Sequence, residues 1–162
     1  MRIPLQFDAS RHFSSPLGPI SLFARDHAIV ALKIGGERAR NVGAAAILTT
    51  AQTQLEHYFA GTATVLDFAV TAVGTDFQQR VWAEIAKLGF GQTTSYAQLA
   101  RQLGTPLASR AVGGAVGANP LPLVIGCHRV LGASGKITGY SGGEGLPTKR
   151  WLLQLEGIAI KE

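Results

Sequence analysis

The sequence predicts an α/β N-terminal domain, a small antiparallel sheet with a helix, followed by a mainly helical C-terminal domain with a helix-turn-helix. Two apolar segments around a polar turn, followed by an apolar stripe of helical spacing, predict the first domain. Capping signatures and glycine stops predict the short helices of the second domain. We place the boundary between them so that the domains are residues 1–73 and 74–162.

The N-terminal elements follow one another closely. Strands are expected at residues 20–24 and 28–34, because these apolar segments flank the turn residues 25–27. Apolar residues at helical spacing predict a helix within residues 44–61. Residues 65–70 are expected to form the third strand. No residue pattern in this half points to catalysis.

The C-terminal helices begin at recognisable caps. Thr75 and Gln78 form a capping-box pattern, and Ser95 and Gln98 repeat that spacing at the start of a second helix, residues 95–103. A third helix is expected to start with Thr105 as its cap and Pro106 in its first turn. Pro147 begins the last helix, which places Glu156 in its final turn, where the helix dipole disfavours an anion. We therefore expect a specific partner for that carboxylate.

The third helix is unusual in having almost no side-chain bulk. Its small residues are Ala111, Gly113, Gly114, Ala115, Gly117 and Ala118, and Arg110 is its one long side chain. Small residues allow close backbone approach, so this helix could enter a narrow DNA groove as the second member of a helix-turn-helix. Tight packing against a neighbouring helix explains the same composition.

The only cysteine, Cys127, is followed at once by His128 and Arg129. The thiolate is the nucleophilic form of cysteine, and a cationic or proton-accepting neighbour lowers the thiol pKa from its usual value of about 8.5. The alternative is a buried, inert cysteine, because the apolar run 123–125 predicts a buried strand that ends at the sulfur. Adjacent residues of a strand point to opposite faces, so the histidine would need a bridging water or a tight turn at Gly126.

Charge and composition narrow the function classes. Of the net charge of +5, residues 1–74 hold six Lys or Arg against five Asp or Glu, and residues 75–162 hold nine against five. A polyanion such as DNA suits the second half, although solvated surface explains a mild surplus equally well. The chain has no long apolar run and no signal-peptide pattern, so we expect a cytoplasmic protein without a membrane partner. One cysteine and no phosphate-loop pattern argue against a metal or any other cofactor.

Six motifs in the second half occur in a characteristic order: GTDFQQRVW, TTSYAQLA, ASRAVGGAVGANP, GCHRV, GYSGG and KRWLLQLE. Together they resemble the O6-alkylguanine-DNA alkyltransferase family, continuously from about residue 74 to residue 156. The resemblance implies a methylated-DNA–[protein]-cysteine S-methyltransferase, a suicide DNA-repair protein that moves an alkyl group from O6 of guanine to its own cysteine. Its partner would be double-stranded DNA containing O6-alkylguanine, bound from the minor groove by a monomer. Activity on O4-alkylthymine and clustering along DNA stay open.

The resemblance also implies a role for each matching residue. Cys127 would accept the alkyl group, His128 would act as a base through a water, and Glu156 would orient His128. Asn119 would hold the active-site turn, and Tyr96 would protonate the leaving guanine. The implied DNA contacts are Arg110, which would fill the place of the flipped base, and Tyr96, Ala111, Gly113 and Gly114. The implied walls of the base pocket are Val130, Tyr140 and Ser141.

This chain departs from the family pattern at Gly126, where the family usually has proline. Glycine leaves free the backbone that proline would fix, so we expect a functional but slower acceptor. Two other hypotheses compete. An alkyltransferase-like protein would bind lesions without chemistry, but such proteins lack the cysteine that is present here. A helix-turn-helix regulator would need longer side chains on the third helix to read the major groove.

Overall fold

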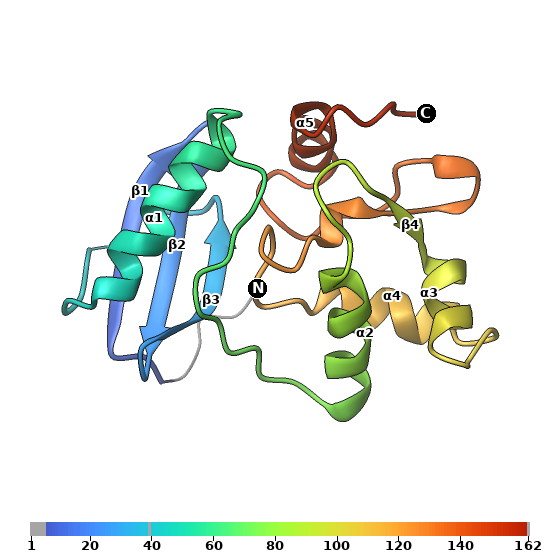
Figure 1. Ribbon diagram of the computed structural model, residues 1–162, viewed down its shortest axis with the longest axis horizontal. Coiled ribbons are helices and arrows are strands. Elements are labelled where there is room, and N and C mark those ends of the chain that lie inside the picture. The colour runs from blue at the N-terminus through green and yellow to red at the C-terminus, as the bar shows by residue number, and fades with distance from the viewer. Residues whose placement is uncertain (1–5, 39, 162) are drawn as a thin grey trace.

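The structure is a computed structural model that describes residues 6–38 and 40–161. A small sheet with one helix across it forms one side of the molecule, and a cluster of helices forms the other (Figure 1). The sheet and its helix come from the first half of the chain, and the cluster comes from the second half. The fold class predicted from the sequence is therefore confirmed, whereas the domain boundary at residue 73 stays a prediction.

The sheet has three antiparallel strands in the order of the sequence: β1 (Ala9–Ser15), β2 (Gly18–Arg25) and β3 (Ala28–Ile34). The predicted turn between β2 and β3 is confirmed. Its residues Asp26 and His27 have φ of 50° and 65°, the pair of positive values that a tight hairpin requires. Ile20 and Leu22 alternate along β2 and fill the core beneath the sheet. Leu32 and Ile29 of β3 join them, the latter after a register shift in the pairing of the two strands.

The prediction of a third strand at residues 65–70 is wrong. The third strand is β1, whose sequence gave no clear alternation, and segment 65–70 only touches the outer edge of β3. That contact is a single bridge in which Ile29 donates to Ala69 and accepts from Thr71. Phe68 is the one buried side chain of the segment, whereas Val65 is 65% exposed, so little apolar surface holds a longer strand in register.

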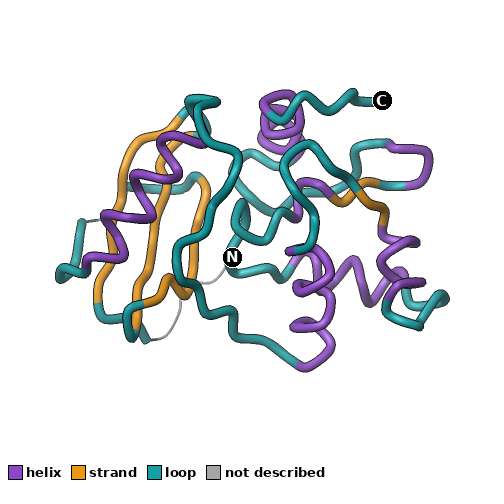
Figure 2. The backbone as a smooth tube through the Cα atoms, viewed as in Figure 1, coloured by secondary structure: helices purple, strands orange, loops and turns teal. Residues whose placement is uncertain are grey.

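Helix α1 (Ala46–Phe59) confirms the predicted N-terminal helix and packs across the sheet. Its buried face ends in Tyr58 and Phe59, which also reach the second half of the chain. The Tyr58 ring lies edge-on to Phe90 with 6.2 Å between ring centroids, and Phe59 lies edge-on to Trp151 at the same distance. Figure 2 shows the long loop that runs from α1 to the next helix between the two sides of the molecule.

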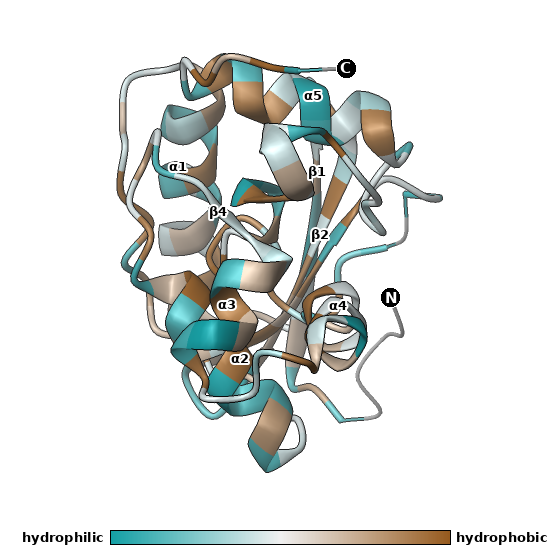
Figure 3. Ribbon diagram, turned by 90° about the vertical axis from the view of Figure 1, so that its right-hand side faces the viewer, coloured by the Kyte–Doolittle hydropathy of each residue, from teal (hydrophilic) through white to brown (hydrophobic). Residues whose placement is uncertain are grey.

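Three helices gather at the end of the molecule that faces the viewer in Figure 3: α2 (Asp76–Ala86), α3 (Tyr96–Gln102) and α4 (Ser109–Gly117). Both predicted caps form, since the Thr75 and Ser95 side chains accept from the amides of Gln78 and Gln98. The start predicted for the third helix is wrong. Residues 105–108 form a turn, closed by the Ala108 amide on the Thr105 carbonyl, and α4 begins at Ser109.

No strand precedes the cysteine, contrary to the prediction. Leu123 has a left-handed φ of 77°, and the Ile125 amide donates to the Leu121 carbonyl, so the buried run is wound into turns. Cys127–Arg129 form a 3-10 turn, η1, and Val130–Leu131 form β5, which pairs in parallel with β4 (Thr94–Ser95). Apolar composition cannot distinguish a buried strand from buried turns.

The chain then passes through a glycine-rich loop, residues 132–145, to α5 (Leu146–Leu155). This loop contains a short 3-10 turn, η2 (Ala133–Gly135). Pro147 lies in the first turn of α5, and Glu156 caps its end, as the sequence predicted. Within the described residues, no helix combines the length and the apolar character needed to cross a membrane.

Candidate active site

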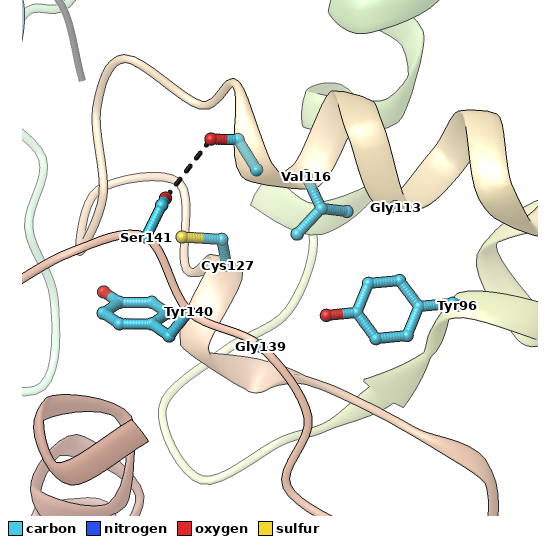
Figure 4. A pocket seen from close by; sticks show the side chains of 8 residues that line it. Tyr96, Gly113, Val116, Cys127, Gly139, Tyr140 and Ser141 are labelled. Carbon is cyan, nitrogen blue, oxygen red and sulfur yellow. Dashed lines mark hydrogen bonds between the residues drawn. The ribbon is translucent and has the colours of Figure 1, made fainter. Parts of the chain in front are cut away.

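A cavity of about 240 Å³ lies between α4 and the glycine-rich loop (Figure 4). A cavity of this volume can admit one planar ring system. Cys127 and Tyr96 enter it from different elements, and the Tyr96 hydroxyl points into the space between them. Its lining residues are Tyr96, Gly113, Val116, Gly117, Cys127, Gly139, Tyr140 and Ser141. Ser141 also donates to the Gly117 carbonyl at 3.2 Å, which ties the loop to α4.

Asn119, just after α4, holds the turns that lead to the cysteine. Its side-chain nitrogen donates to the Ile125 carbonyl at 2.7 Å, and its side-chain oxygen accepts from the Leu121 amide at 2.9 Å. The side chain is buried, so it supplies partners for two backbone groups that water does not reach. This cross-link fixes the backbone two residues before the sulfur.

Cys127 is buried, and burial raises the pKa of its thiol above the usual value. The hydrogen bond from Asn119 and the positive charge of Lys149 oppose this effect without outweighing it. The expectation of a lowered thiol pKa is therefore wrong for the free protein, because the effect of burial is larger than that of the groups that favour the thiolate. The thiol keeps its proton until a base removes it.

His128 is a buried base. Its Nε2 atom lies 2.5 Å from Oε2 of Glu156, and a carboxylate can only accept, so Nε2 carries the proton. Nδ1 is then the basic nitrogen, and it is buried without a hydrogen-bond partner among the described residues. Burial lowers the pKa of His128, more strongly than Glu156 raises it. The ring is accordingly neutral at pH 7 and can accept a proton at Nδ1.

Glu156 is the hub of the site. Oε1 accepts from the Gly91 amide at 2.9 Å and from Nε of Arg129 at 2.8 Å. Oε2 accepts from His128, from Nη2 of Arg129 at 3.0 Å and from the Tyr58 hydroxyl at 2.7 Å. Burial alone would raise the pKa of Glu156, but the hydrogen bonds from His128, Arg129 and the Gly91 amide hold it far below its usual range. The carboxylate is a fixed negative charge behind the histidine.

Lys149 places a second cation near the sulfur. Its ammonium is fully buried and donates to three carbonyls: Val130 at 2.6 Å, Thr138 at 2.9 Å and Gly139 at 3.2 Å. It therefore joins the strand after the cysteine to the loop that walls the pocket. Burial lowers the pKa of Lys149 to about 8, so at neutral pH most of the molecules carry this charge.

Helix α4 presents one open face next to the pocket. Val112, Ala115 and Val116 are buried, and the Trp82 indole donates to the Ala115 carbonyl at 2.8 Å. Gly114 and Gly117 have nothing within 4 Å of the place a Cβ would occupy. Tight packing thus does not explain these two glycines, which leaves close approach by an external partner. Arg110 and Ala111 are exposed on the same helix.

The structure brings together most of the residues singled out from the sequence. Tyr96, Gly113, Cys127, Tyr140 and Ser141 line the pocket, and His128, Glu156 and Asn119 lie behind it. Arg110, Ala111 and Gly114 lie on the exposed part of α4. Val130 is buried outside the lining, and its carbonyl is occupied by Lys149.

Sequence reasoning did not find Tyr58, Lys149 or the role of Arg129. Lys149 had a signal, because it precedes Leu152 and Leu153 by three and four residues on the buried side of α5. Tyr58 had none, since 98 residues separate it from Glu156. Among the described residues no group of three or more His, Cys, Asp or Glu side chains could hold a metal ion.

The fold and the site together define a helix-turn-helix protein that carries a buried cysteine, with a base behind it, in a base-sized pocket beside an open helix. Residues 76–158 match the model of the 6-O-methylguanine DNA methyltransferase DNA-binding domain, and residues 11–72 match that of its ribonuclease-like domain. The chain belongs to the 6-O-methylguanine DNA methyltransferase family.

Individual relatives agree along most of the chain. A methylated-DNA–protein-cysteine methyltransferase of Mycobacterium tuberculosis is 42% identical over 151 residues, which is 90% of each chain. That of Salmonella typhimurium is 50% identical over 108 residues, 66% of this chain and 62% of its own. The structure of M. tuberculosis OGT in complex with DNA superposes with a TM-score of 0.81 at 43% identity and covers 91% of both chains. An O6-methylguanine DNA methyltransferase of Methanococcus jannaschii gives 0.64 at 26% identity, covering 94% of this chain and 96% of its own.

Proposed function

We propose that this chain repairs DNA by moving the alkyl group of O6-alkylguanine onto Cys127, once per molecule and irreversibly. Family membership makes it a DNA-repair methyltransferase with a cysteine acceptor, and it binds DNA. The observation that carries the assignment to Cys127 is its position: the only sulfur nucleophile of the chain lines a base-sized pocket next to the open face of α4.

The open helix face supports entry from the minor groove. Atoms at O6 of a stacked guanine are out of reach, so the damaged nucleotide has to leave the duplex, at a cost of a few kcal/mol. Gly114 and Gly117 let the backbone of α4 approach the DNA closely. Arg110, one helical turn before Gly114, is the long side chain that would occupy the vacated place in the stack. The flipped base would then enter between Tyr96 and Cys127.

The proton of the thiol has a path to a base. His128 is neutral and its Nδ1 is free, so the Cys127 proton can pass through a bridging water to that nitrogen. The imidazolium that forms is stabilised by the Glu156 carboxylate against its Nε2. The positive charge of Lys149 favours the thiolate at the same moment.

Transfer forms one bond and breaks another. The thiolate sulfur attacks the alkyl carbon, the S–C bond forms, and the O6–C bond breaks with its electrons going to the purine. Tyr96 suits the role of proton donor at N3 of the leaving base, because burial raises the pKa of its hydroxyl and keeps it protonated. The proton that His128 took from the thiol then reprotonates the Tyr96 phenolate, directly or by exchange through solvent, so that both side chains end neutral. The product thioether has no leaving group that this site could activate, so a second turnover is excluded.

Mass spectrometry of the intact protein after incubation with duplex DNA containing one O6-methylguanine tests the proposal. We expect one added methyl group, located on Cys127 by peptide mapping, and none in Cys127→Ser. Binding with no change in mass would instead support the alkyltransferase-like alternative. Repeating the assay with O4-methylthymine establishes whether that lesion is also a substrate, and sedimentation on DNA distinguishes a monomer from clusters. We further propose a cytoplasmic location, which fractionation of the producing cells would test.

A further inference from the structure

The N-terminal half of the chain contributes one polar group to the site. Tyr58 lies in the last turn of α1, is 1% exposed, and donates its hydroxyl hydrogen to Oε2 of Glu156 at 2.7 Å. Its ring is held edge-on by Phe59 at 5.7 Å and by Phe90 at 6.2 Å between centroids. The phenol is thus fixed in direction by packing on two sides and aims at one oxygen of the catalytic carboxylate.

This oxygen is the one that also faces the histidine. Nε2 of His128, Nη2 of Arg129 and the Tyr58 hydroxyl all point to Oε2. A carboxylate oxygen has two lone pairs, so three donors share them and each reduces the charge available to the others. Without the hydroxyl, Oε2 would bind the His128 proton more strongly. The hydroxyl therefore acts on His128 through Glu156, without touching the substrate pocket.

We propose that Tyr58 is a positioning residue through which the N-terminal half sets the proton affinity of the His128–Glu156 pair. The inference rests on the proposed function, since it concerns the base that serves Cys127. It gives the N-terminal half, which has no catalytic residue of its own, a part in the chemistry.

The other charged and titratable groups around the pair do not replace this effect. Arg129, in η1, faces Glu156 on both oxygens, and Lys149 of α5 opposes protonation of His128 from the far side. Cys127 and Tyr140 lie on the pocket side. The loop that contains Gly91 offers only a backbone amide. Apart from His128 itself, Tyr58 is the neutral side chain among the described residues that donates to Glu156. Burial and the nearby carboxylate raise the pKa of its hydroxyl, so it stays a donor at all working pH values.

The sign of the effect follows from this competition. A stronger hydrogen bond from Glu156 stabilises protonated His128, which cannot act as a base. In Tyr58→Phe the acid limb of the pH–rate profile, where the transfer rate falls as His128 becomes protonated, should therefore move to higher pH. We expect a shift of about half a pH unit for the loss of one ordinary hydrogen bond. A fluorinated tyrosine at position 58 has a more acidic phenol and is a stronger donor. It should move the same limb to lower pH, a reversal that a change in packing would not produce.

The experiment measures single-turnover methyl transfer from duplex O6-methylguanine DNA against pH, for the full chain and three variants. Tyr58→Phe keeps the shape of the ring, and the fluorotyrosine protein keeps the whole side chain. Leu48→Ala is the matched control, because it weakens the packing of α1 in its first turn and leaves the Tyr58 hydroxyl and both ring contacts of Tyr58 in place. Thermal unfolding of each protein verifies that the assays use folded material.

Opposite shifts in Tyr58→Phe and the fluorotyrosine protein, with an unshifted limb in Leu48→Ala, support the proposal. The proposal is overturned if the acid limbs of both Tyr58 variants lie within about 0.2 pH unit of that of the unmodified protein, which is the precision of such a profile. Tyr58 is then a packing residue. A shift in the same direction for all three variants also overturns it. Absence of transfer by the unmodified protein contradicts the proposed function instead, so the two failures are distinguishable.

Discussion

Lys149 makes the stability of this protein depend on pH in an unusual direction. Burial lowers the pKa of its ammonium from 10.5 to about 8, because its three carbonyl partners only partly replace water. Between these two pH values the unfolded chain binds the proton and the folded chain does not, so stability rises with pH. At neutral pH Lys149 is charged in both states, so burying the ammonium lowers the free energy of unfolding by its full amount, about 3 kcal/mol for the difference between the two pKa values.

Replacing Lys149 by Met removes that pH dependence. We expect the stability difference between the unmodified protein and Lys149→Met to move in favour of the unmodified protein by about 3 kcal/mol as pH rises from 7 to 10.5. Urea unfolding of both proteins at pH 7, 8.5, 9.5 and 10.5 measures it, and the comparison cancels the titrating groups on which the Lys149 charge does not act. A difference that stays constant with pH would show that this ammonium has its ordinary pKa in the folded state, against the reasoning.

Three further predictions concern the site. Glu156→Gln should cost about 3–5 kcal/mol of unfolding free energy in urea, because it leaves the Arg129 guanidinium buried without its carboxylate; a loss below 1 kcal/mol would contradict this. Gly126 has a φ of −71°, a value that proline also adopts. Gly126→Pro should therefore raise the free energy of unfolding by about 0.5–1 kcal/mol and transfer methyl faster, although Arg129 atoms lie 3.0 Å from the position of the added Cβ. Equal transfer rates would refute a loosened acceptor. Arg110→Ala should slow transfer from duplex DNA about 10-fold to 100-fold, while reaction with free O6-methylguanine base stays unchanged; equal slowing of both would argue against insertion into the stack.

The periodic elements could be predicted from the sequence because their signals are local. Apolar segments on both sides of a polar turn marked β2 and β3, and caps at Thr75 and Ser95 marked two helix starts that the structure confirms. The buried run before the cysteine could not be assigned correctly. It is wound into turns by a left-handed Leu123, a conformation that leucine seldom adopts and that its neighbours do not announce.

The residues of the site also divide into those that could be predicted from the sequence and those that could not. Cys127 and His128 are adjacent, and the motifs located their partner Glu156 along the chain. The hydrogen bonds that tune the carboxylate come from Tyr58, Gly91 and Arg129, and only packing of the two halves brings them together. A tertiary contact over 98 residues leaves no periodic trace in a single sequence. The direction of the thiol pKa was likewise a property of burial, which adjacent charges did not reveal.

The most direct test of the account is the mass of the protein after one encounter with its substrate. Purified chain is mixed with an equal amount of duplex containing a single O6-methylguanine, and both protein and DNA are weighed by mass spectrometry. The account predicts one methyl gained by the Cys127 peptide and one lost by the oligonucleotide, with no further gain when more DNA is added. Protein and DNA that bind each other and keep their original masses would contradict it.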